Sequence, residues 1–336
     1  MRVFIAGGAG LIGAKVAKLL HHQGCEVLIY DALLNYLSPF DRDGGLSQLA
    51  KHPWSIGELL HRRFGEIKDS GRIKFVRGDI RYKGHLYSQI SSFRPDVIVD
   101  FAAIPLSSES NVFTEDACTV NINGVQNILE CIRSISKPIK FVFASSSMVY
   151  GDFRYAPCDE SHDTVPIDIY GATKLSAEKI IGAYHRQFGI DYSIIRPSAV
   201  YGPTDANFRV VQVFINKALS GQKLTLHNPE SMLDFTYVDD IAQGFFLAIT
   251  ESKANGNIFN ITRGEGRSLN DLVIELTKYF PRLEVTLTER DVGEIRSERG
   301  ALDISKARNM LGYRPLQSLE EGLALYLRDD FGIEKP

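Results

Sequence analysis

The chain has 336 residues, of which 44% are hydrophobic and 24% are charged, and its formal net charge is −3 at pH 7. This length suits one large domain with a smaller lobe, and the interspersed charges give no reason to expect a nucleic-acid partner. No apolar run is long enough to cross a bilayer, and the first predicted strand begins at Arg2 without the pattern of a signal peptide. We therefore expect a cytoplasmic protein without a membrane partner. The eight histidines form no metal-ligand pattern, and no metal site is expected.

The first predicted elements enclose a glycine-rich turn. Residues 2–6 form a short apolar run typical of a buried parallel strand, and apolar residues recur at helical spacing after the turn. In such a unit Gly7 permits the sharp turn, Gly10 lets the backbone approach a pyrophosphate, and Gly13 lets the helix pack on the strand. The first amides of the helix face the anion. We expect a dinucleotide to contact Gly7, Gly10, Leu11, Ile12 and Gly13.

The second predicted strand, residues 26–30, ends on Asp31. Its distance from the glycines is close to that at which an acidic residue meets the adenosine ribose of a dinucleotide. A carboxylate there accepts hydrogen bonds from two ribose hydroxyls and repels a 2′-phosphate, which favours NAD over NADP. The alternative is a glycine turn in an ordinary βαβ unit, in which Asp31 merely ends a strand.

The connection formed by residues 32–71 is roughly twice as long as a simple crossover needs. Apolar residues recur at helical spacing from Trp54 to Ile67, which predicts an added helix. A loop with aromatic members, residues 35–40, precedes it. The insertion could be a lid, a subunit contact or internal packing. We favour packing or a subunit contact, because an apolar stripe is more often core than site.

A buried-strand pattern at residues 141–144 runs into a serine triplet, Ser145 to Ser147. Serines at the carboxyl end of a parallel strand lie where ligands bind in such sheets. Farther on, Tyr170 and Lys174 are four residues apart on a predicted helix and share one face. The lysine cation and the positive nicotinamide ring would lower the tyrosine pKa from about 10, so that Tyr170 could take a proton from a hydroxyl. Many helices contain a tyrosine and a lysine at this spacing by chance. The preceding serine triplet favours the interpretation that Tyr170 and Lys174 belong to a proton-transfer site.

With these motifs, the sequence resembles the extended short-chain dehydrogenase/reductase superfamily. Within it, the chain is similar to the NAD-dependent nucleotide-sugar epimerases and dehydratases, such as the UDP-glucose 4-epimerases. The glycine spacing is GxxGxxG, and the resemblance covers most of the chain. Further motifs in the family's order are Gly78-Asp79-Ile80, Asp100-Phe101-Ala102-Ala103, Asn121-Ile122-Asn123-Gly124, Arg196-Pro197, Val200-Tyr201-Gly202-Pro203, the segment 234–240 and Leu311-Gly312-Tyr313-Arg314-Pro315.

The resemblance implies further contacts with bound NAD. Asp79 and Ile80 match the aspartate and the apolar residue that contact adenine, and Asn121 matches an asparagine near the nicotinamide. Residues 100–103 match a His-x-Ala-Ala cofactor loop, in which Asp100 replaces the usual histidine. The implied catalytic residues are Ser146, Tyr170 and Lys174, and the implied cofactor contacts also include Phe101, Ala102, Ala103, Tyr170 and Lys174.

Met148 limits which of the family's reactions the resemblance implies for this chain. In 4,6-dehydratases the residues after the catalytic threonine resemble Asp-Glu, and a glutamate similarly follows in decarboxylases, whereas Ser146 is followed by Ser147 and Met148. Elimination and decarboxylation are disfavoured unless a carboxylate comes from elsewhere in the fold. The serine at 146 and Glu109-Ser110 resemble UDP-sugar 4-epimerases, so we expect C4 epimerisation of a nucleoside-diphosphate hexose or hexuronate through a 4-keto intermediate. The alternatives are a nucleotide-sugar dehydrogenase or ketosugar reductase, then a 4,6-dehydratase or decarboxylase, and last a dinucleotide-sensing regulator.

The substrate half departs from the family pattern. Ala199 stands where many UDP-sugar epimerases have an asparagine that contacts the diphosphate, and Leu233 stands where an arginine often precedes Asp-Phe-Thr-Tyr. Other arginines offer planar donors that suit phosphate oxygens, although each is as readily a surface charge. The expected substrate contacts are Ser145, Ser147, Asn207, Arg209, Arg296 and Arg299.

We expect an α/β protein with a Rossmann-type, doubly wound parallel sheet and a smaller α/β lobe that binds the substrate. The helix after Asn121 and the helix of Tyr170 resemble a pair through which relatives commonly dimerise. By this analogy we expect a homodimer, with burial of the pair inside one subunit as the alternative. The NAD-binding domain is predicted at residues 1–190 with returns near 191–195 and 235–249, and the substrate-binding lobe at 196–234 and 250–336.

Overall fold

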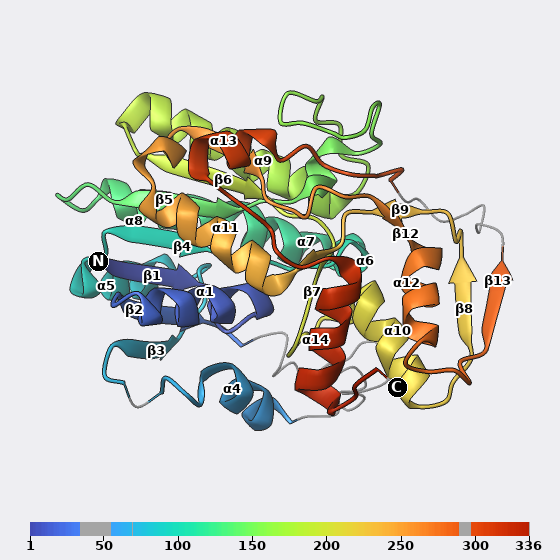
Figure 1. Ribbon diagram of the computed structural model, residues 1–336. Helices are drawn as coiled ribbons and strands as arrows, with labels where there is room; N and C mark the ends of the chain where they lie inside the picture. The colour runs from blue at the N-terminus through green and yellow to red at the C-terminus, as the bar shows by residue number, and fades with distance from the viewer. Residues whose placement is uncertain (34–54, 69, 289–296, 336) are drawn as a thin grey trace.

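The computed structural model describes residues 1–33, 55–68, 70–288 and 297–335. Across its central sheet the strands are β11 (Asn257–Asn260), β6 (Tyr192–Arg196), β5 (Lys140–Ala144), β4 (Val97–Asp100), β1 (Arg2–Ala6), β2 (Glu26–Asp31) and β3 (Ile73–Arg77). All seven are parallel, which confirms the expected doubly wound fold (Figure 1). The direction of winding reverses between β1 and β4, and ligands bind at such a point.

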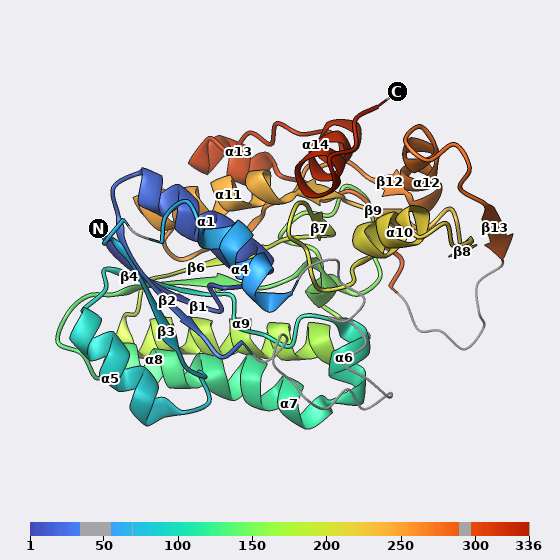
Figure 2. The ribbon, with the colours of Figure 1, turned by 90° about the horizontal axis from the view of Figure 1, so that it is seen from below.

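The inner strands of the sheet are buried on both faces, so their alternating side chains divide the core into two layers. In β1, Val3 and Ile5 join one buried cluster while Phe4 and Ala6 join the other, because successive side chains of a strand point to opposite faces. Helices cover both layers, which explains why the strands read as continuous apolar runs. One face carries α1 (Leu11–His22), α11 (Val238–Thr250) and α13 (Ser305–Leu311), and the other carries α5 (Lys83–Phe93), α8 (Val125–Arg133) and α9 (Ile169–Phe188) (Figure 2).

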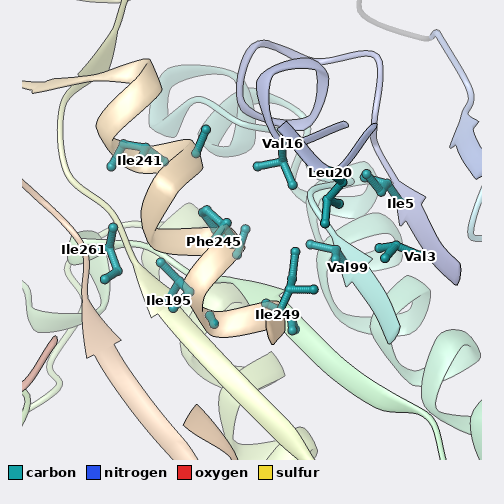
Figure 3. Packing of buried hydrophobic residues seen from close by; sticks show 14 of the residues in the cluster. Val3, Ile5, Val16, Leu20, Val99, Ile195, Ile241, Phe245, Ile249 and Ile261 are labelled. Atoms are coloured by element: carbon teal, nitrogen blue, oxygen red, sulfur yellow. The ribbon is translucent and has the colours of Figure 1, made fainter. Parts of the chain in front are cut away.

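The first helix packs against a helix from much later in the chain. Figure 3 shows Val16 and Leu20 of α1 in the same buried cluster as Phe245 and Ile249 of α11 and the strand residue Val99. All but Ile249 of these side chains are fully buried, and each such side chain contributes about 1.5–3 kcal/mol. This packing joins α11 to the sheet and fixes the start of α1 beside the glycine-rich turn.

The sheet extends past the boundary predicted for the first domain. β11 pairs with β6, with Ile258 opposite Ile194, and forms an edge strand. Phe259 is fully buried in the cluster that includes α1, α11 and α13. The assignment of residues 250–336 wholly to the lobe is therefore wrong for residues 257–260. The pattern did not reveal this strand because only two apolar residues lie between its asparagines.

A smaller lobe lies beside the carboxyl ends of the sheet strands (Figures 1 and 2). It has a buried cluster of its own, which includes Tyr201, Phe214 and Leu272. The cluster lies between helices and pairs of short strands. These elements are α10 (Val210–Leu219), α12 (Leu269–Thr277) and α14 (Leu319–Phe331), and the paired strands are β7 (Val200–Tyr201) with β10 (Thr236–Tyr237), β9 (Met232–Leu233) with β12 (Arg267–Ser268), and β8 (Leu224–His227) with β13 (Val285–Thr288).

Several short helices connect these elements. In chain order they are α6 (Ser107–Val112), α7 (Thr114–Cys118), the π-helix η1 (Thr119–Gly124), and the 3-10 helices η2 (Ser147–Tyr150) and η3 (Ser252–Ala254). None of the helices in the described ranges is long and apolar enough to cross a membrane. The same ranges contain no group of three histidine, cysteine or acidic side chains that could hold a metal ion.

The insertion after β2 contains a helix, α4 (Ile56–Phe64), within the segment where one was predicted. Ser55 caps it reciprocally, because its hydroxyl accepts from the Glu58 amide at 3.2 Å and the Glu58 carboxylate accepts from the Ser55 amide at 2.7 Å. Leu59 is fully buried, and Phe64 packs against the cluster around α1. The predicted loop at 35–40 lies outside the described residues.

One side chain of α4 links the glycine-rich turn to the lobe. Arg63 is only 2% exposed and donates to the carbonyl of Ala9 in the turn. Its Nε and Nη2 donate to the hydroxyl and carbonyl of Thr204, just after β7. The neighbouring Arg62 pairs with Asp330 of α14 at 3.4 Å. The described part of the insertion therefore packs inside the subunit against both parts of the molecule.

Candidate active site

A cavity of about 840 Å³ opens at the carboxyl ends of the sheet strands and extends to the lobe. It joins segments that lie far apart in the sequence. Towards the glycine-rich turn its lining includes Gly7, Gly10, Leu11, Ile12, Gly13, Asp31, Asp79, Ile80, Phe101, Ala102 and Ala103. Towards the lobe it includes Ser145, Ser146, Ser147, Tyr170, Lys174, Asn207, Arg209 and Arg299. The structure thus brings together the sequence-predicted residues except Asn121, which does not line the cavity, and Arg296, which lies outside the described residues.

Two positions of the turn between β1 and α1 require glycine. Gly7 has a φ of +68°, and a Cβ there would lie 2.4 Å from the backbone nitrogen of Ala102. A Cβ on Gly13 would lie 2.7 Å from the Gly7 carbonyl oxygen. Gly10 stands at the N-cap of α1, where no side chain caps the helix. The first amides of α1 are therefore available to an anion such as a pyrophosphate.

Asp31 is held at the cavity by two backbone amides. Its Oδ2 accepts from Ala9 N and its Oδ1 from Leu33 N, each at 2.8 Å. Burial raises the pKa of Asp31, while these two hydrogen bonds and the charge of Arg63 oppose the rise. A carboxylate has about four acceptor sites, so acceptors remain for ribose hydroxyls. With the glycine-rich turn, this arrangement fits NAD.

The adenine-side residues are held by partners that the sequence does not reveal. The Asp79 carboxylate accepts from Arg81 Nε at 2.9 Å and from Arg81 Nη2 at 2.7 Å, and Arg81 N donates to Asp79 Oδ1 at 2.9 Å. Ile80 is buried against Gly124, where a Cβ would lie 2.3 Å from Ile80 Cδ1. Arg81 therefore orients the carboxylate that the sequence predicts at the adenine.

Asn121 lies behind the cavity wall, which corrects the expectation of a direct cofactor contact. It is fully buried in the π-helix η1. Its Oδ1 accepts from Ile104 N, and its Nδ2 donates to Thr173 Oγ1, each at 3.0 Å. Thr173 Oγ1 in turn donates to the Tyr170 carbonyl at 2.8 Å. Asn121 thus ties the loop after β4 to the helix of Tyr170, and a π-helix is frequent at such functional positions.

Ser146, Tyr170 and Lys174 meet at the end of β5. Tyr170 and Ser146 both line the cavity, and Ser146 Oγ accepts from Met148 N at 3.2 Å. Lys174 is 2% exposed, and its Nζ lies 6.0 Å from the centroid of the Tyr170 ring and donates to the Ala144 carbonyl at 2.8 Å. The site therefore brings a phenol, a hydroxyl and an ammonium group together.

The electrostatics of Tyr170 involve a second cation. Burial raises the pKa of Tyr170, while the charge of Arg209 and the hydrogen bond to Ser146 lower it. Burial lowers the pKa of Lys174 to about 8, and its acidic neighbours oppose this shift. The sequence argument assigned the activation of Tyr170 to Lys174 and the nicotinamide. The structure adds Arg209, which comes from the lobe and which no local spacing connects to Tyr170.

The position of Tyr170 depends on a cap that the sequence reasoning missed. Asp168 caps α9, because its Oδ1 accepts from Gly171 N at 2.7 Å. Its Oδ2 accepts from Ser107 Oγ at 2.7 Å, so the start of α9 is tied to α6. An aspartate just before a predicted helix is the usual cap signal and could have identified this residue.

The serines beside Ser146 differ in their environments. Ser145 Oγ donates to Glu178 Oε1 at 2.5 Å, and Glu178 pairs with the buried Arg196 at 2.6 Å. The Ser145 hydroxyl is thus engaged by a buried ion pair while Ser145 also lines the cavity. Ser147 is 1% exposed, and its Oγ has no hydrogen-bond partner within the part of the chain that the structure describes.

The lobe wall places two of the predicted arginines at the cavity. Arg209 lies 3.7 Å from Asp205 Oδ1, which also accepts from Asn207 N at 3.1 Å. Asp205 is buried and thereby orders this loop. Arg299 reaches the cavity from a segment about ninety residues later in the chain. Apolar residues of the same wall include Ala199, Phe208, Val210, Leu233 and Leu269.

Comparison with known proteins agrees with this geometry. Residues 3–262 match the NAD dependent epimerase/dehydratase family. The chain is 33% identical to UDP-glucuronic acid decarboxylase 6 of Arabidopsis thaliana, over 99% of this chain and 89% of that protein. It resembles the solved UDP-glucose 4-epimerase of Thermotoga maritima with UDP-glucose, with a TM-score of 0.81 and 26% identity over 98% of each chain. For UDP-glucuronic acid 4-epimerase from Bacillus cereus with UDP-glucuronic acid and NAD, the TM-score is 0.82 and the identity 28%, over 97% of this chain and 98% of that one.

Proposed function

The chain belongs to the NAD-dependent epimerase/dehydratase family, and on this premise we propose that it epimerises a nucleoside-diphosphate hexose or hexuronate at C4. NAD is the cofactor of this family. Epimerisation removes a proton and a hydride at one carbon and restores both, so the cofactor is recycled. The solved 4-epimerases that the chain resembles support this choice.

The observation that carries the proposal is the environment of the reacting hydroxyls. Met148 lines the cavity beside them, and its thioether cannot serve as the acid or base of an elimination. Asp168 is the acidic side chain of the described lining at this end, and its two oxygens already accept from Gly171 N and Ser107 Oγ. Apart from this cap of α9, the described lining at the end that faces the sugar has no carboxylate. The other aspartates of the described lining, at the adenosine end, are Asp31 and Asp79.

The proposed chemistry depends on proton transfer by this chain. Tyr170 takes the proton of the C4 hydroxyl and later returns it, and Ser146 hydrogen-bonds the same oxygen. Arg209 supplies positive charge that stabilises the phenolate, and Lys174 places a second cation 6.0 Å from the centroid of the Tyr170 ring. NAD held by the glycine-rich turn and Asp31 would supply the acceptor and donor of hydride for C4. The keto sugar must turn between these steps, so the lobe must hold the nucleotide firmly and the sugar loosely.

We assign the diphosphate to the arginines of the lobe wall. Arg209 and Arg299 line the cavity, and a guanidinium presents donors in a plane that matches phosphate oxygens. Arg296 is part of this proposal from its sequence position alone. We further propose that the sheet domain binds NAD, that the lobe binds the nucleotide sugar, and that two copies pair through α8 and α9.

Decarboxylation of a nucleoside-diphosphate hexuronate is the second candidate, because one relative is named a UDP-glucuronic acid decarboxylase. A 4-keto hexuronate is a β-keto acid and loses CO₂ readily, so the same oxidation by Tyr170 would begin either reaction. The two outcomes differ in the product, since decarboxylation leaves a pentose and epimerisation leaves all the carbons in place.

The test is proton NMR of the purified protein with a panel of UDP-, dTDP-, GDP- and CDP-hexoses and hexuronates, with nicotinamide absorbance followed in the same samples. We expect a C4 epimer without net NADH, and the panel then identifies the nucleotide and the sugar together. Accumulation of NADH would indicate a dehydrogenase, a pentose product would indicate a decarboxylase, and a 4-keto-6-deoxy product would indicate a dehydratase. Any of these three results would overturn the proposal.

A further inference from the structure

Thr204 has a backbone conformation that its side chain disfavours. It lies in the loop between β7 and α10, and its φ is +67°. A β-branched residue rarely adopts this left-handed conformation unless the surrounding structure fixes it. Thr204 is only 9% exposed, so its polar groups need partners inside the protein. The conformation therefore points to contacts that hold this residue from more than one side.

Two side chains from distant parts of the chain hold Thr204. The Asp330 carboxylate of α14 accepts from Thr204 N at 2.8 Å. Arg63 of α4 donates to the Thr204 carbonyl and, at 3.3 Å, to its hydroxyl. Asp330 and Arg63 are both buried, which strengthens these hydrogen bonds. The amide, the carbonyl and the hydroxyl of Thr204 are thus all engaged by this pair, which we call the Thr204 clamp.

The two side chains of the Thr204 clamp are themselves held in place. Arg62, also in α4, lies with its Nη1 3.4 Å from Asp330 Oδ1. Arg63 also donates to the carbonyl of Ala9 in the glycine-rich turn. These contacts join α4 to α14 and to the sheet domain. The clamp therefore holds Thr204 against three separate parts of the molecule.

The loop after Thr204 carries three residues of the cavity lining, Asn207, Phe208 and Arg209. Asp205 orders this loop, because its Oδ1 accepts from Asn207 N at 3.1 Å and lies 3.7 Å from Arg209 Nη1. Asp205 directly follows Thr204 in the chain. A change of φ at Thr204 would therefore move the Asp205 carboxylate away from both groups. The direction of Asn207 and Arg209 depends on the conformation of Thr204.

The other end of the loop has an anchor of its own. Phe208 N donates to Gln212 Oε1 at 2.7 Å, and Gln212 is 1% exposed in α10. Phe208 also has a positive φ, of +51°. A loop this short has little freedom while both ends are anchored. Loss of the anchor at Thr204 would leave residues 205–207 free to move.

We propose that Asp330 and Arg63 are positioning residues that hold Thr204 in its left-handed conformation. In this way they direct Asn207 and Arg209 towards the nucleotide sugar. The role of these two side chains towards the substrate rests on the proposed function, whereas the order of the loop can be measured without a ligand. Neither Asp330 nor Arg63 belongs to the described cavity lining. The added helix α4 thus serves the substrate site from outside the cavity.

The first test is Asp330→Ala, which removes the acceptor of the Thr204 amide. Hydrogen exchange of the segment 204–209, followed by mass spectrometry, should become about tenfold faster, because loss of a hydrogen bond to a charged group lowers the free energy of local opening. Arg63→Met should accelerate exchange of the same segment, since it removes the other half of the clamp.

The second measurement is the affinity of Asp330→Ala for a nucleoside diphosphate. Calorimetric titration with UDP, dTDP, GDP and CDP first identifies the one that the unsubstituted protein binds most tightly. Its affinity should fall by about tenfold, as for one lost hydrogen bond between charged groups. NAD affinity should stay unchanged, because Arg63 still binds the glycine-rich turn. A purely structural role of Asp330 would not separate the two affinities.

Two further variants at the end of α14 serve as controls. Asp330→Asn keeps an oxygen that can accept from the Thr204 amide, so it should retain the slow exchange and most of the nucleoside-diphosphate affinity. Asp329→Ala removes the neighbouring carboxylate, which pairs with Arg328 at 2.8 Å, and should leave both quantities unchanged. Asp330→Ser keeps the test available if the alanine variant does not fold, because its hydroxyl fills part of the space without the reach of the carboxylate.

The conformation of Thr204 has a test of its own. Glycine adopts a positive φ about as readily as a negative one. Thr204→Gly, introduced into the Asp330→Ala background, should therefore restore part of the nucleoside-diphosphate affinity. Thr204→Val in the same background keeps the β-branched shape and should restore none. Equal affinities of the two double variants would show that the backbone conformation at this position is unimportant.

Two results would overturn the proposal. One is unchanged exchange of the segment 204–209 in the folded variants Asp330→Ala and Asp330→Ser. The other is faster exchange with an unchanged nucleoside-diphosphate affinity, because the loop would then not serve the substrate site. If the unsubstituted protein binds none of the four diphosphates, the proposed function fails, while the exchange measurement still decides whether Asp330 fixes the loop.

Discussion

The two ends of the cavity are built from different parts of the chain. At the cofactor end the glycine-rich turn presents backbone to the cavity: Gly7 approaches the Ala102 backbone, and the first amides of α1 lie open beyond Gly10. At the lobe end it is formed by side chains, including Arg209 and Arg299, that come from separate loops. A site made of backbone requires particular residues at fixed spacing, whereas a wall of side chains can change without changing the fold.

This difference explains why the cofactor is easier to identify than the substrate. The glycine-rich turn tolerates no Cβ at Gly7 or Gly13. A chain that keeps this turn must therefore keep these glycines, and the motif can be recognised from the sequence. At the lobe end, Ala199 and Leu233 line the cavity at two positions where the family pattern predicts polar contacts, and the fold is still similar to that of the solved 4-epimerases. The sugar and base are therefore set by positions that the fold leaves free to vary.

The largest effect is expected where the two ends meet, at Tyr170. Tyr170→Phe removes the proton-transferring oxygen, and we expect kcat to fall by roughly 10³-fold, as for other general acid–base groups. NAD binding should be retained, because the ring remains. Steady-state kinetics and NAD titration measure these two quantities. Tyr184→Phe is the matched control on the same helix, since the Tyr184 hydroxyl bonds Glu130 instead, and retained activity in Tyr170→Phe would contradict the proposed role.

The next prediction concerns only the cofactor end of the cavity, where the glycine-rich turn lies. In Gly7→Ala the new Cβ combines a positive φ of +68° with an approach of 2.4 Å to the Ala102 nitrogen, so the turn must move. We expect NAD affinity to fall by on the order of 10²-fold, measured by calorimetric titration. Gly189→Ala is the control, because Gly189 has a φ of +69° with nothing within 4 Å and should cost only about 1 kcal/mol of stability. Equal NAD affinities in the two variants would show that the close approach is unimportant.

The contrast between the two ends also marks how far the sequence could predict the structure. The strands of the first part of the chain, the glycine-rich turn and the serine–tyrosine–lysine set can be predicted from local sequence patterns. In the structure they lie at the predicted positions. Tertiary partners do not follow from local pattern. They account for the correction at Asn121, which binds Thr173, and for the bond of the Ser145 hydroxyl to Glu178. The edge strand β11 was missed because two apolar residues are too few for a periodic signal.

A third prediction concerns Arg63, whose hydrogen bonds link the glycine-rich turn to the lobe. Arg63→Met removes the bonds to Ala9 and Thr204 and leaves their buried carbonyls without this donor. We expect a loss of about 3 kcal/mol in unfolding free energy, because charged hydrogen bonds in buried sites are among the stronger ones. Denaturant unfolding measures this loss, and NAD affinity should fall with it because the turn is no longer held. Arg62→Met, which removes a partly exposed pair with Asp330, should cost less; an equal cost would remove Arg63 from this linking role.

The smallest effects should distinguish Ser145 from Ser147, the serines on either side of Ser146. The buried Ser147 hydroxyl lies at the cavity and has no hydrogen-bond partner among the residues that the structure describes, whereas the Ser145 hydroxyl is bound to Glu178. Ser147→Ala should therefore raise KM for the sugar nucleotide by a few fold, as for one lost neutral hydrogen bond of about 1 kcal/mol, with stability nearly unchanged. Ser145→Ala should instead lower the unfolding free energy by about 1–2 kcal/mol with KM unchanged, because it strips a donor from a buried ion pair. Kinetics and denaturant unfolding of both variants test this division, and a KM effect in Ser145→Ala alone would reverse the assignment of the two hydroxyls.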